Sequence, residues 1–321
     1  MKTKRFDVSS IGESMLRLSI PAGNRLENTR ALDVGTAGAE GNVLNALGHL
    51  GRSCAWVSGL PDNPLGRLAA NHLRKADVNL DGVIWRDAGR MGVYFVEFST
   101  PPRPIQVIYD RVDSVIASLT PDQIDWAFLL DTRLLHLTGI TPALSASCAA
   151  IVAESIQRAK AQNVPISFDM NYRGKLWTPE EARAAVTPLL QEIDLFFCAR
   201  GDAEVVFDCT GEPEKMLQQL VQLSNARTVI MSIGEQGVIA WHDGQIYREP
   251  SVPVEVVDRI GAGDGLAAGV IHGWLKEDLV LGLRYGVTMA ALALTEHGDT
   301  VTTSRAELDA LVNSASGGVW R

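Results

Sequence analysis

Residues 260–271 read Ile-Gly-Ala-Gly-Asp-Gly-Leu-Ala-Ala-Gly-Val-Ile, and this stretch constrains the fold most strongly. Gly261 and Gly263 allow backbone conformations that a β-carbon would forbid, so successive N–H groups can turn toward one anion. The apolar run predicts a helix beginning near Asp264, whose positive dipole end would point to the same place. Asp264 could then take a proton from a hydroxyl while the amides, including that of Ala262, stabilise a phosphoryl group in transfer. The alternative is that Asp264 only caps the helix.

The size and composition of the chain favour one packed domain. It has 321 residues, of which 46% are hydrophobic and 21% charged, and we predict a single domain over residues 1–321. Acidic residues number 38 and basic ones 29, and the net charge of −9 without a basic cluster argues against nucleic acid or a membrane as partner. No signal-peptide core or membrane-length apolar run occurs, so we expect a cytoplasmic protein. The four cysteines and six histidines lack metal-ligand spacing.

Strand-like and helix-like segments alternate along most of the chain. Strands are predicted at 6–11, 55–59, 134–138, 164–169, 195–198 and 228–232, and helices at 38–50, 65–73, 146–161, 178–191 and 203–207. This alternation predicts an α/β fold with a doubly wound, mostly parallel sheet flanked by helices. Ligands of such folds bind beyond the carboxyl ends of the strands, where Asp169, Gly234 and the turn before Gly261 would fall.

One part of the chain departs from this alternation. Residues 92–111 read as two strands joined by a proline-rich turn, which predicts a hairpin. Together with residues 14–35, the segment 90–112 could form a small, discontinuous β-sheet lid. A lid would exclude water from a transferring phosphoryl group. The alternative is a β-arm used for dimerisation, and both roles can hold together.

The familiar nucleotide-binding fingerprints are missing. No Gly-x-x-x-x-Gly-Lys-Ser/Thr sequence occurs, and Gly35, Gly38 and Gly41 do not have the spacing of a dinucleotide-binding turn. A second glycine turn, Gly234-Glu235-Gln236-Gly237, is weak evidence alone because any hairpin could carry it. The residues therefore indicate a late anion-binding turn rather than either of these common solutions.

Three motifs in register resemble one family. They are 38–42 (Gly-Ala-Glu-Gly-Asn), 234–237 (Gly-Glu-Gln-Gly) and 258–264 (Asp-Arg-Ile-Gly-Ala-Gly-Asp), and they occur in the order and spacing of the ribokinase-like (pfkB) sugar kinases. The resemblance covers essentially the whole chain. It implies a doubly wound α/β core with a β-lid, ATP and Mg²⁺ as cofactors, and transfer of the γ-phosphoryl group to a primary hydroxyl of a sugar.

Within that family the chain is most similar to kinases of 2-keto-3-deoxygluconate. The similarity lies in residues 109–118 and 167–177. Such a sugar acid carries a carboxylate, so Arg111 and Arg173 would clamp its oxygen atoms, and Tyr94 and Tyr109 would supply hydroxyls and flat walls. The alternatives are a surface ion pair with Asp169 or a nearby Glu for Arg173 and packing within the lid for the tyrosines.

The resemblance also implies roles for further residues. Gly38 would let the substrate approach the backbone, and Asp299 would contact a sugar hydroxyl, although a Gly-Asp turn explains Asp299 equally well. The complete predicted set is Asp264, Gly261, Ala262 and Gly263 for catalysis, Gly38, Asn42, Tyr94, Tyr109, Arg111, Asp169, Asn171, Arg173 and Asp299 for the substrate, Ser232, Gly234, Gly237, Gly261 and Gly263 for the nucleotide, and Asp202 for the metal. A homo-oligomer through the β-lid is expected.

The chain departs from the family pattern at three places. Arg259 stands where threonine is often found, and residues 199–202 (Ala-Arg-Gly-Asp) align with Asn-x-x-Glu. Asp202 keeps a carboxylate that could hold Mg²⁺ through water, whereas Ala199 cannot donate a hydrogen bond. Ser232 stands where a longer polar or basic residue is frequent.

Three other functions compete with a sugar-acid kinase. A kinase of a neutral ketohexose, ribose or a nucleoside would leave two arginines facing no anion, which is costly. A non-catalytic sugar-acid sensor on the same fold has no need of Asp264. A nicotinamide oxidoreductase is disfavoured by the missing fingerprint.

Overall fold

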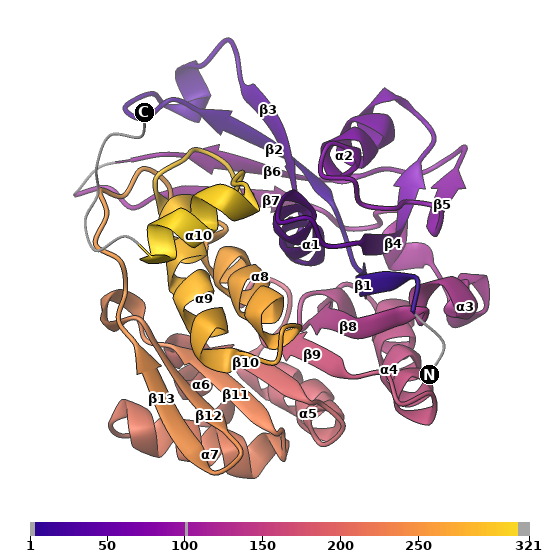
Figure 1. Cartoon of the computed structure of the whole chain (residues 1–321). Coiled ribbons are helices and arrows are strands. Elements are labelled where there is room, and N and C mark those ends of the chain that lie inside the picture. The colour runs from indigo at the N-terminus through magenta and orange to yellow at the C-terminus, as the bar shows by residue number, and fades with distance from the viewer. Residues whose placement is uncertain (1–3, 100–101, 314–321) are drawn as a thin grey trace.

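A nine-stranded sheet forms the centre of the computed structural model, which describes residues 4–99 and 102–313. Its strand order is β13-β12-β11-β10-β9-β8-β1-β4-β5 (Figure 1). Neighbouring strands are parallel from β5 to β11, and β12 and β13 add antiparallel at one edge. The strands are β1 (Phe6–Ile11), β4 (Cys54–Pro61), β5 (Val83–Arg86), β8 (Thr132–Thr138), β9 (Ile166–Asp169), β10 (Leu195–Ala199), β11 (Thr228–Ser232), β12 (Val238–His242) and β13 (Gln245–Glu249).

Helices cover both faces of this sheet because alternate strand residues point to opposite sides. On β10, Phe196 and Cys198 join one apolar core, and Leu195 and Phe197 join the other. The first core is covered by α3 (Trp126–Leu129), α4 (Ala146–Ala161), α5 (Pro179–Leu190), α6 (Arg200–Phe207) and α7 (Pro213–Ser224). The second is covered by α1 (Ala39–His49), α2 (Pro64–Arg74), α8 (Ala262–Trp274), α9 (Leu279–Leu294) and α10 (Arg305–Asn313). The doubly wound α/β prediction is confirmed.

A second, four-stranded sheet lies at the top of Figure 1. It consists of β3 (Asp33–Ala37), β2 (Met15–Ile20), β6 (Gly92–Glu97) and β7 (Gln106–Asp110), in that order. β6 and β7 form the expected antiparallel hairpin, and β2 pairs parallel with β6. Met15, Tyr94 and Val96 belong to a small apolar cluster on its inner face. The predicted small sheet is therefore present.

Some predicted boundaries are wrong. β9 begins at Ile166 rather than at 164, because Pro165 has no N–H to donate to a neighbouring strand. α6 begins at Arg200 rather than at 203, so Asp202 lies in its first turn, where a carboxylate is favoured. Gly201 lowers the helix propensity of that turn and hides it from a sequence pattern. Over residues 4–99 and 102–313, no helix has the length and apolar character needed to cross a bilayer.

Candidate active site

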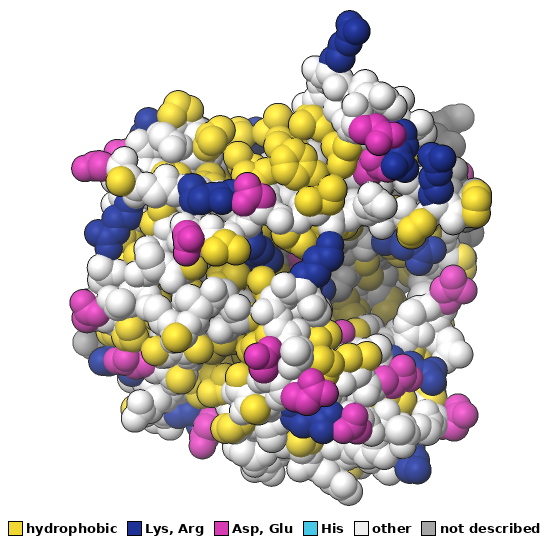
Figure 2. All heavy atoms as spheres, turned by 180° about the vertical axis from the view of Figure 1, so that it is seen from behind, with side chains coloured by type: hydrophobic (Ala, Val, Ile, Leu, Met, Phe, Trp, Pro, Cys, Tyr) yellow, Lys and Arg dark blue, Asp and Glu magenta, His cyan; other side chains and the backbone are white. Residues whose placement is uncertain are grey.

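A pocket of about 450 Å³ lies between the inner face of the small sheet and the carboxyl ends of β9, β10 and β11. Figure 2 shows a hollow below the upper part of the molecule, with Lys or Arg side chains at its rim. The predicted residues that line the pocket are Gly38, Asn42, Tyr94, Tyr109, Arg111, Asp169, Asn171, Arg173, Asp202, Ser232, Gly261, Gly263, Asp264 and Asp299. The fold thus gathers residues from segments that are far apart in the sequence.

The N-terminus of α8 presents bare backbone to this pocket. Gly261 is the N-cap, with a φ of 90°, a left-handed conformation that favours glycine. A β-carbon there would come within 2.2 Å of the main-chain oxygen of Asp299. By contrast, outside the backbone of α8 itself no atom lies within 4 Å of the position that a β-carbon on Gly263 would take. The N–H groups of the first turn, which include that of Ala262, lack intrahelical partners and are suited to holding an anion.

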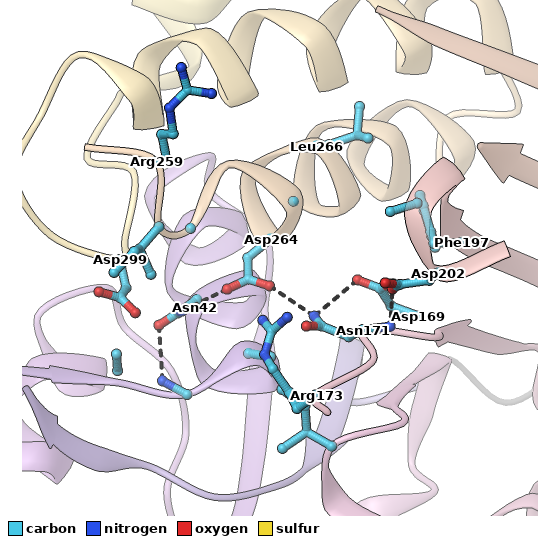
Figure 3. Close-up of a pocket in the computed structure, with 18 of the residues that line it drawn as sticks. Asn42, Asp169, Asn171, Arg173, Phe197, Asp202, Arg259, Asp264, Leu266 and Asp299 are labelled. Atoms are coloured by element: carbon cyan, nitrogen blue, oxygen red, sulfur yellow. Dashed lines mark hydrogen bonds between the residues drawn. The ribbon is translucent and has the colours of Figure 1, made fainter. Parts of the chain in front are cut away.

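Asp264 lies inside α8 rather than at its cap, so the capping alternative is wrong. Asn42 Nδ2 donates to its Oδ2 at 2.7 Å, and Asn171 Nδ2 lies 3.4 Å from its Oδ1 (Figure 3). Burial raises the pKa of Asp264 to about 7, and the hydrogen bond from Asn42 limits the rise. A carboxylate with a pKa near neutrality is well matched to taking a proton from a hydroxyl.

Asp169, at the end of β9, lies on the other side of Asn171. Its two oxygen atoms accept from the main-chain N and the Nδ2 of Asn171, both at 3.2 Å. Asn171 has a φ of 42°, which asparagine tolerates better than most residues, and this bend brings its amide between the two carboxylates (Figure 3). Burial raises the pKa of Asp169 to about 8, with further contributions from the charges of Asp264 and Asp202.

The carboxylates of Asp202 and Asp169 fit Mg²⁺ better than a tightly bound transition metal. Among the described residues, no group of three His, Cys, Asp or Glu side chains could hold a metal ion. Magnesium commonly uses only one or two protein carboxylates and completes its shell with water and phosphate oxygens. Burial raises the pKa of Asp202, and the mutual repulsion of these acids would be relieved by a divalent cation.

The two predicted arginines have different surroundings. Arg111 is buried, and its Nε donates to Glu13 Oε2 at 2.9 Å, while Ser114 Oγ donates to Glu13 Oε1 at 2.6 Å. Its charge is therefore balanced by Glu13, which is not among the residues predicted from the sequence. Arg173 is exposed, and its guanidinium bonds only the carbonyl of Tyr172, at 3.3 Å. Within the described ranges it forms no ion pair with Asp169 or a nearby Glu, although its charge lowers the pKa of Asp169.

The remaining inner wall combines aromatic rings and a carboxylate. The rings of Tyr94 and Tyr109 stack with centroids 5.7 Å apart. Tyr94 OH donates to Asp299 Oδ2 at 2.8 Å, and Arg17 forms an ion pair with the same carboxylate. Arg17 was also missed, although a charged residue at an inward-facing strand position, between Met15 and Ser19, was a usable signal.

The glycine motif at the start of α1 has a packing role as well. A β-carbon on Gly38 would lie 1.9 Å from the main-chain oxygen of Glu13, so the backbones approach closely there. Asn42 Oδ1 accepts from the Gly38 N–H at 3.2 Å, which orients the amide that reaches Asp264. Glu40 is buried below the pocket and accepts from the hydroxyls of Thr138 and Thr141, at 2.7 and 2.6 Å.

The second glycine turn lies next to the pocket but does not line it. Ser232 is part of the wall, whereas Gly234 and Gly237 are not among its lining residues. They have φ values of 62° and 94° and form the tight connection between β11 and β12. A β-carbon on Gly237 would come within 2.2 Å of the main-chain oxygen of Glu249, so packing alone accounts for a glycine at this position. Their nucleotide role stays a prediction.

Known proteins resemble the chain over its whole length. A 2-dehydro-3-deoxygalactonokinase of Haloferax volcanii is 36% identical over 316 residues, covering 98% of this chain and 99% of its own. A 5-dehydro-2-deoxygluconokinase of Bacillus subtilis is 25% identical, with 98% of each chain covered. The crystal structure of 2-dehydro-3-deoxygluconokinase from Thermotoga maritima superposes with a TM-score of 0.91 at 33% identity, covering 97% of this chain and all of the other.

The family model for pfkB carbohydrate kinases matches residues 5–306. The match includes both ends of the pocket, from the glycine motif before α1 to the loop after α9. The pocket, the position of Asp264 and the similarity to sugar kinases agree, and the chain is a member of the pfkB family of carbohydrate kinases.

Proposed function

We propose that the protein transfers the γ-phosphoryl group of ATP to a primary hydroxyl of 2-keto-3-deoxygluconate or of a closely related keto-deoxy sugar acid. The observation that carries the phosphoryl transfer is the buried Asp264, with a pKa of about 7, in the first turn of a helix whose N-terminal glycines face the pocket. The similarity to 2-keto-3-deoxy sugar-acid kinases supports the acceptor class.

Asp264 would act as the general base on the acceptor hydroxyl. In its ionised form Asp264 accepts a hydrogen bond from Asn42, which holds the carboxylate in one orientation. The N–H groups at the start of α8 would stabilise negative charge on the transferring group, and Gly263 keeps that space free of side-chain atoms. When bound, Mg²⁺ would neutralise charge on the phosphate oxygens, and Asp202 and Asp169 are the residues that would hold it.

Arg173 supports the choice of a sugar acid over a neutral sugar. Arg111 faces the pocket too, but Glu13 balances its charge. Arg173 lines the pocket, and its positive charge lowers the pKa of both Asp169 and Asp264. It would therefore be the principal partner of a substrate carboxylate, with Arg111 contributing hydrogen bonds.

The acceptor assignment is tested by ADP release with 2-keto-3-deoxygluconate, its galactonate epimer, fructose and ribose. Arg173→Ala should lower kcat/KM for the sugar acids about 10- to 100-fold, the scale of losing a hydrogen bond to a charged group. Neutral sugars, which do not use this charge, should be spared. Arg227→Ala is the matched control, because Arg227 is an exposed arginine paired with Asp243 outside the pocket. Wild type preferring a neutral sugar would refute the assignment.

We also propose that the small sheet serves as a lid and as a dimer contact. Its outer face carries an apolar row across all four strands: Val34, Leu18, Phe95 and Ile108 are cross-strand neighbours. Val34 and Ile108 are 58% and 50% exposed, and a second copy would bury them. Light scattering tests this: wild type should be a dimer, and Val34→Glu with Ile108→Glu should give monomers. A monomeric wild type at micromolar concentration would contradict it.

A further inference from the structure

We propose that Arg17 is a positioning residue, which ties the small sheet to the two loops beside the N-terminus of α8 and keeps Asp299 as an ionised acceptor for a sugar hydroxyl. This inference rests on the proposed sugar-kinase function and extends it to a residue outside the predicted site. Arg17 does not line the pocket, so it would act through Asp299 rather than on the substrate directly.

The guanidinium of Arg17 is almost completely enclosed. It projects from the inner face of β2, and only 4% of its side chain is exposed. Nη2 donates to Asp258 Oδ2 and Nη1 donates to Asp299 Oδ1. The ring of Phe98 lies 5.5 Å from the guanidinium carbon on another side. The charge is therefore held between two carboxylates that come from different loops.

Asp258 and Asp299 both contact the backbone beside the N-terminal turn of α8, which would hold the phosphoryl group. Asp258 Oδ1 accepts from the N–H of Ile260 at 3.0 Å, and its Oδ2 accepts from the N–H of Gly298 at 3.3 Å. Asp258 thus joins the loop before α8 to the loop after α9. The main-chain oxygen of Asp299 lies against Gly261, where a β-carbon would come within 2.2 Å. A strand of the small sheet is in this way connected to the N-cap of α8.

Asp299 retains acceptor capacity toward the pocket. An ionised carboxylate has about four lone-pair sites, and Arg17 and Tyr94 occupy one on each oxygen. Tyr94 donates its only proton to Asp299. A sugar hydroxyl could therefore still donate to the remaining lone-pair sites of the Asp299 carboxylate. Burial raises the pKa of Asp299, and the Arg17 guanidinium and the Tyr94 hydroxyl limit that rise. Without the guanidinium this carboxylate would bind a proton more readily and lose an acceptor site.

A purely structural ion pair has no need of this arrangement. Two carboxylates share one guanidinium, and one of the two, Asp299, lines the pocket while the other is completely buried. If the pair served only stability, its loss would weaken the fold and affect both substrates alike. If Arg17 positions Asp299, its loss should raise the KM for the sugar more than the KM for ATP, because Asp299 is the carboxylate that would contact a sugar hydroxyl.

The test compares Arg17→Ala with Arg90→Ala. Arg90 is the matched control because its ion pair with Asp110 also involves the small sheet but is exposed. We expect Arg17→Ala to raise KM for the sugar about 10- to 100-fold, with little change in KM for ATP. Millimolar guanidinium should partly restore the sugar KM of Arg17→Ala and leave that of Arg90→Ala unchanged. Equal increases in both KM values, or no restoration in the folded variant, would overturn the proposal.

A second pair of variants covers the case in which Arg17→Ala does not fold. Arg17→Lys keeps the buried charge, but one ammonium group cannot reproduce the fork that reaches both carboxylates. Its sugar KM should lie between those of wild type and Arg17→Ala, and a wild-type value would overturn the proposal. Asp299→Asn should raise the sugar KM by a smaller factor in the Arg17→Lys background than in wild type, because both changes weaken the same acceptor. Full additivity would also count against it.

The acceptor used in these measurements keeps this proposal separate from the proposed function. Each KM is measured with whichever sugar wild type phosphorylates most efficiently. If wild type prefers a neutral sugar, the sugar-acid assignment fails, and the Arg17 experiment proceeds unchanged with that neutral sugar. If wild type uses the sugar acid and Arg17→Ala affects both substrates equally, only the positioning role fails.

Discussion

Replacing Asp264 with asparagine should separate catalysis from stability. The substitution preserves shape and removes the only charge in the first turn of α8. Without a base on the acceptor hydroxyl, we expect turnover to fall about 10²- to 10⁴-fold, the usual share of a positioned general base. KM values for sugar and ATP should change little, because Asn42 can still donate to the amide oxygen of the new side chain, and only the longer contact from Asn171 is lost.

The same substitution should stabilise the protein above neutral pH. The pKa of Asp264 rises from 3.8 to about 7 on folding, and at about 1.4 kcal/mol per pKa unit this is a penalty of about 4 kcal/mol for the ionised form. A raised pKa in an acid means that the folded state is penalised increasingly as pH rises from about 4 to about 7. The gain of Asp264→Asn should therefore be full near pH 8 and absent near pH 4.

Two assays check this prediction. Steady-state ADP release gives the loss in turnover, and thermal unfolding of wild type and Asp264→Asn between pH 4 and pH 8 gives the difference in stability. For a domain of 321 residues, each 1 kcal/mol corresponds to about 1.5 °C in Tm. Turnover near the wild-type value would show that Asp264 is not the base. A Tm difference that does not grow with pH would show that its charge is not buried at a cost.

Further predictions concern the helix turn, the pH profile and the metal. Gly263→Val should fold with a nearly unchanged Tm but lose phosphoryl transfer. Gly261→Val should fail to fold, because Gly261 has a positive φ and the main-chain oxygen of Asp299 lies close to it. Measuring Tm and turnover for both variants distinguishes these outcomes. The kcat/KM should rise with pH through about 7 as Asp264 loses its proton, measured in a pH-rate profile, and a flat profile would contradict this. Asp202→Asn should raise the Mg²⁺ concentration for half-maximal activity about tenfold, measured by titration; an unchanged value would remove it from the metal site.

Local sequence patterns were sufficient to predict the fold and the helix turn. Gly261, Gly263 and Asp264 belong to one short segment, and glycine flexibility and helix periodicity act over a few residues. The strand and helix alternation is likewise local, so the doubly wound sheet and the small hairpin sheet followed from the chain itself. The family match over residues 5–306 agrees with these predictions.

Only the tertiary structure decided how the charges are paired. Both Arg111 and Arg173 suggested anion binding in the sequence, but the fold places Glu13 against Arg111 and leaves Arg173 exposed at the pocket. Asn42 reaches Asp264 across 222 positions of the chain, and Arg17 reaches Asp299 across 282. Ion pairing and pKa depend on burial and on neighbours brought together by packing, and neither is encoded in the spacing of residues along one segment.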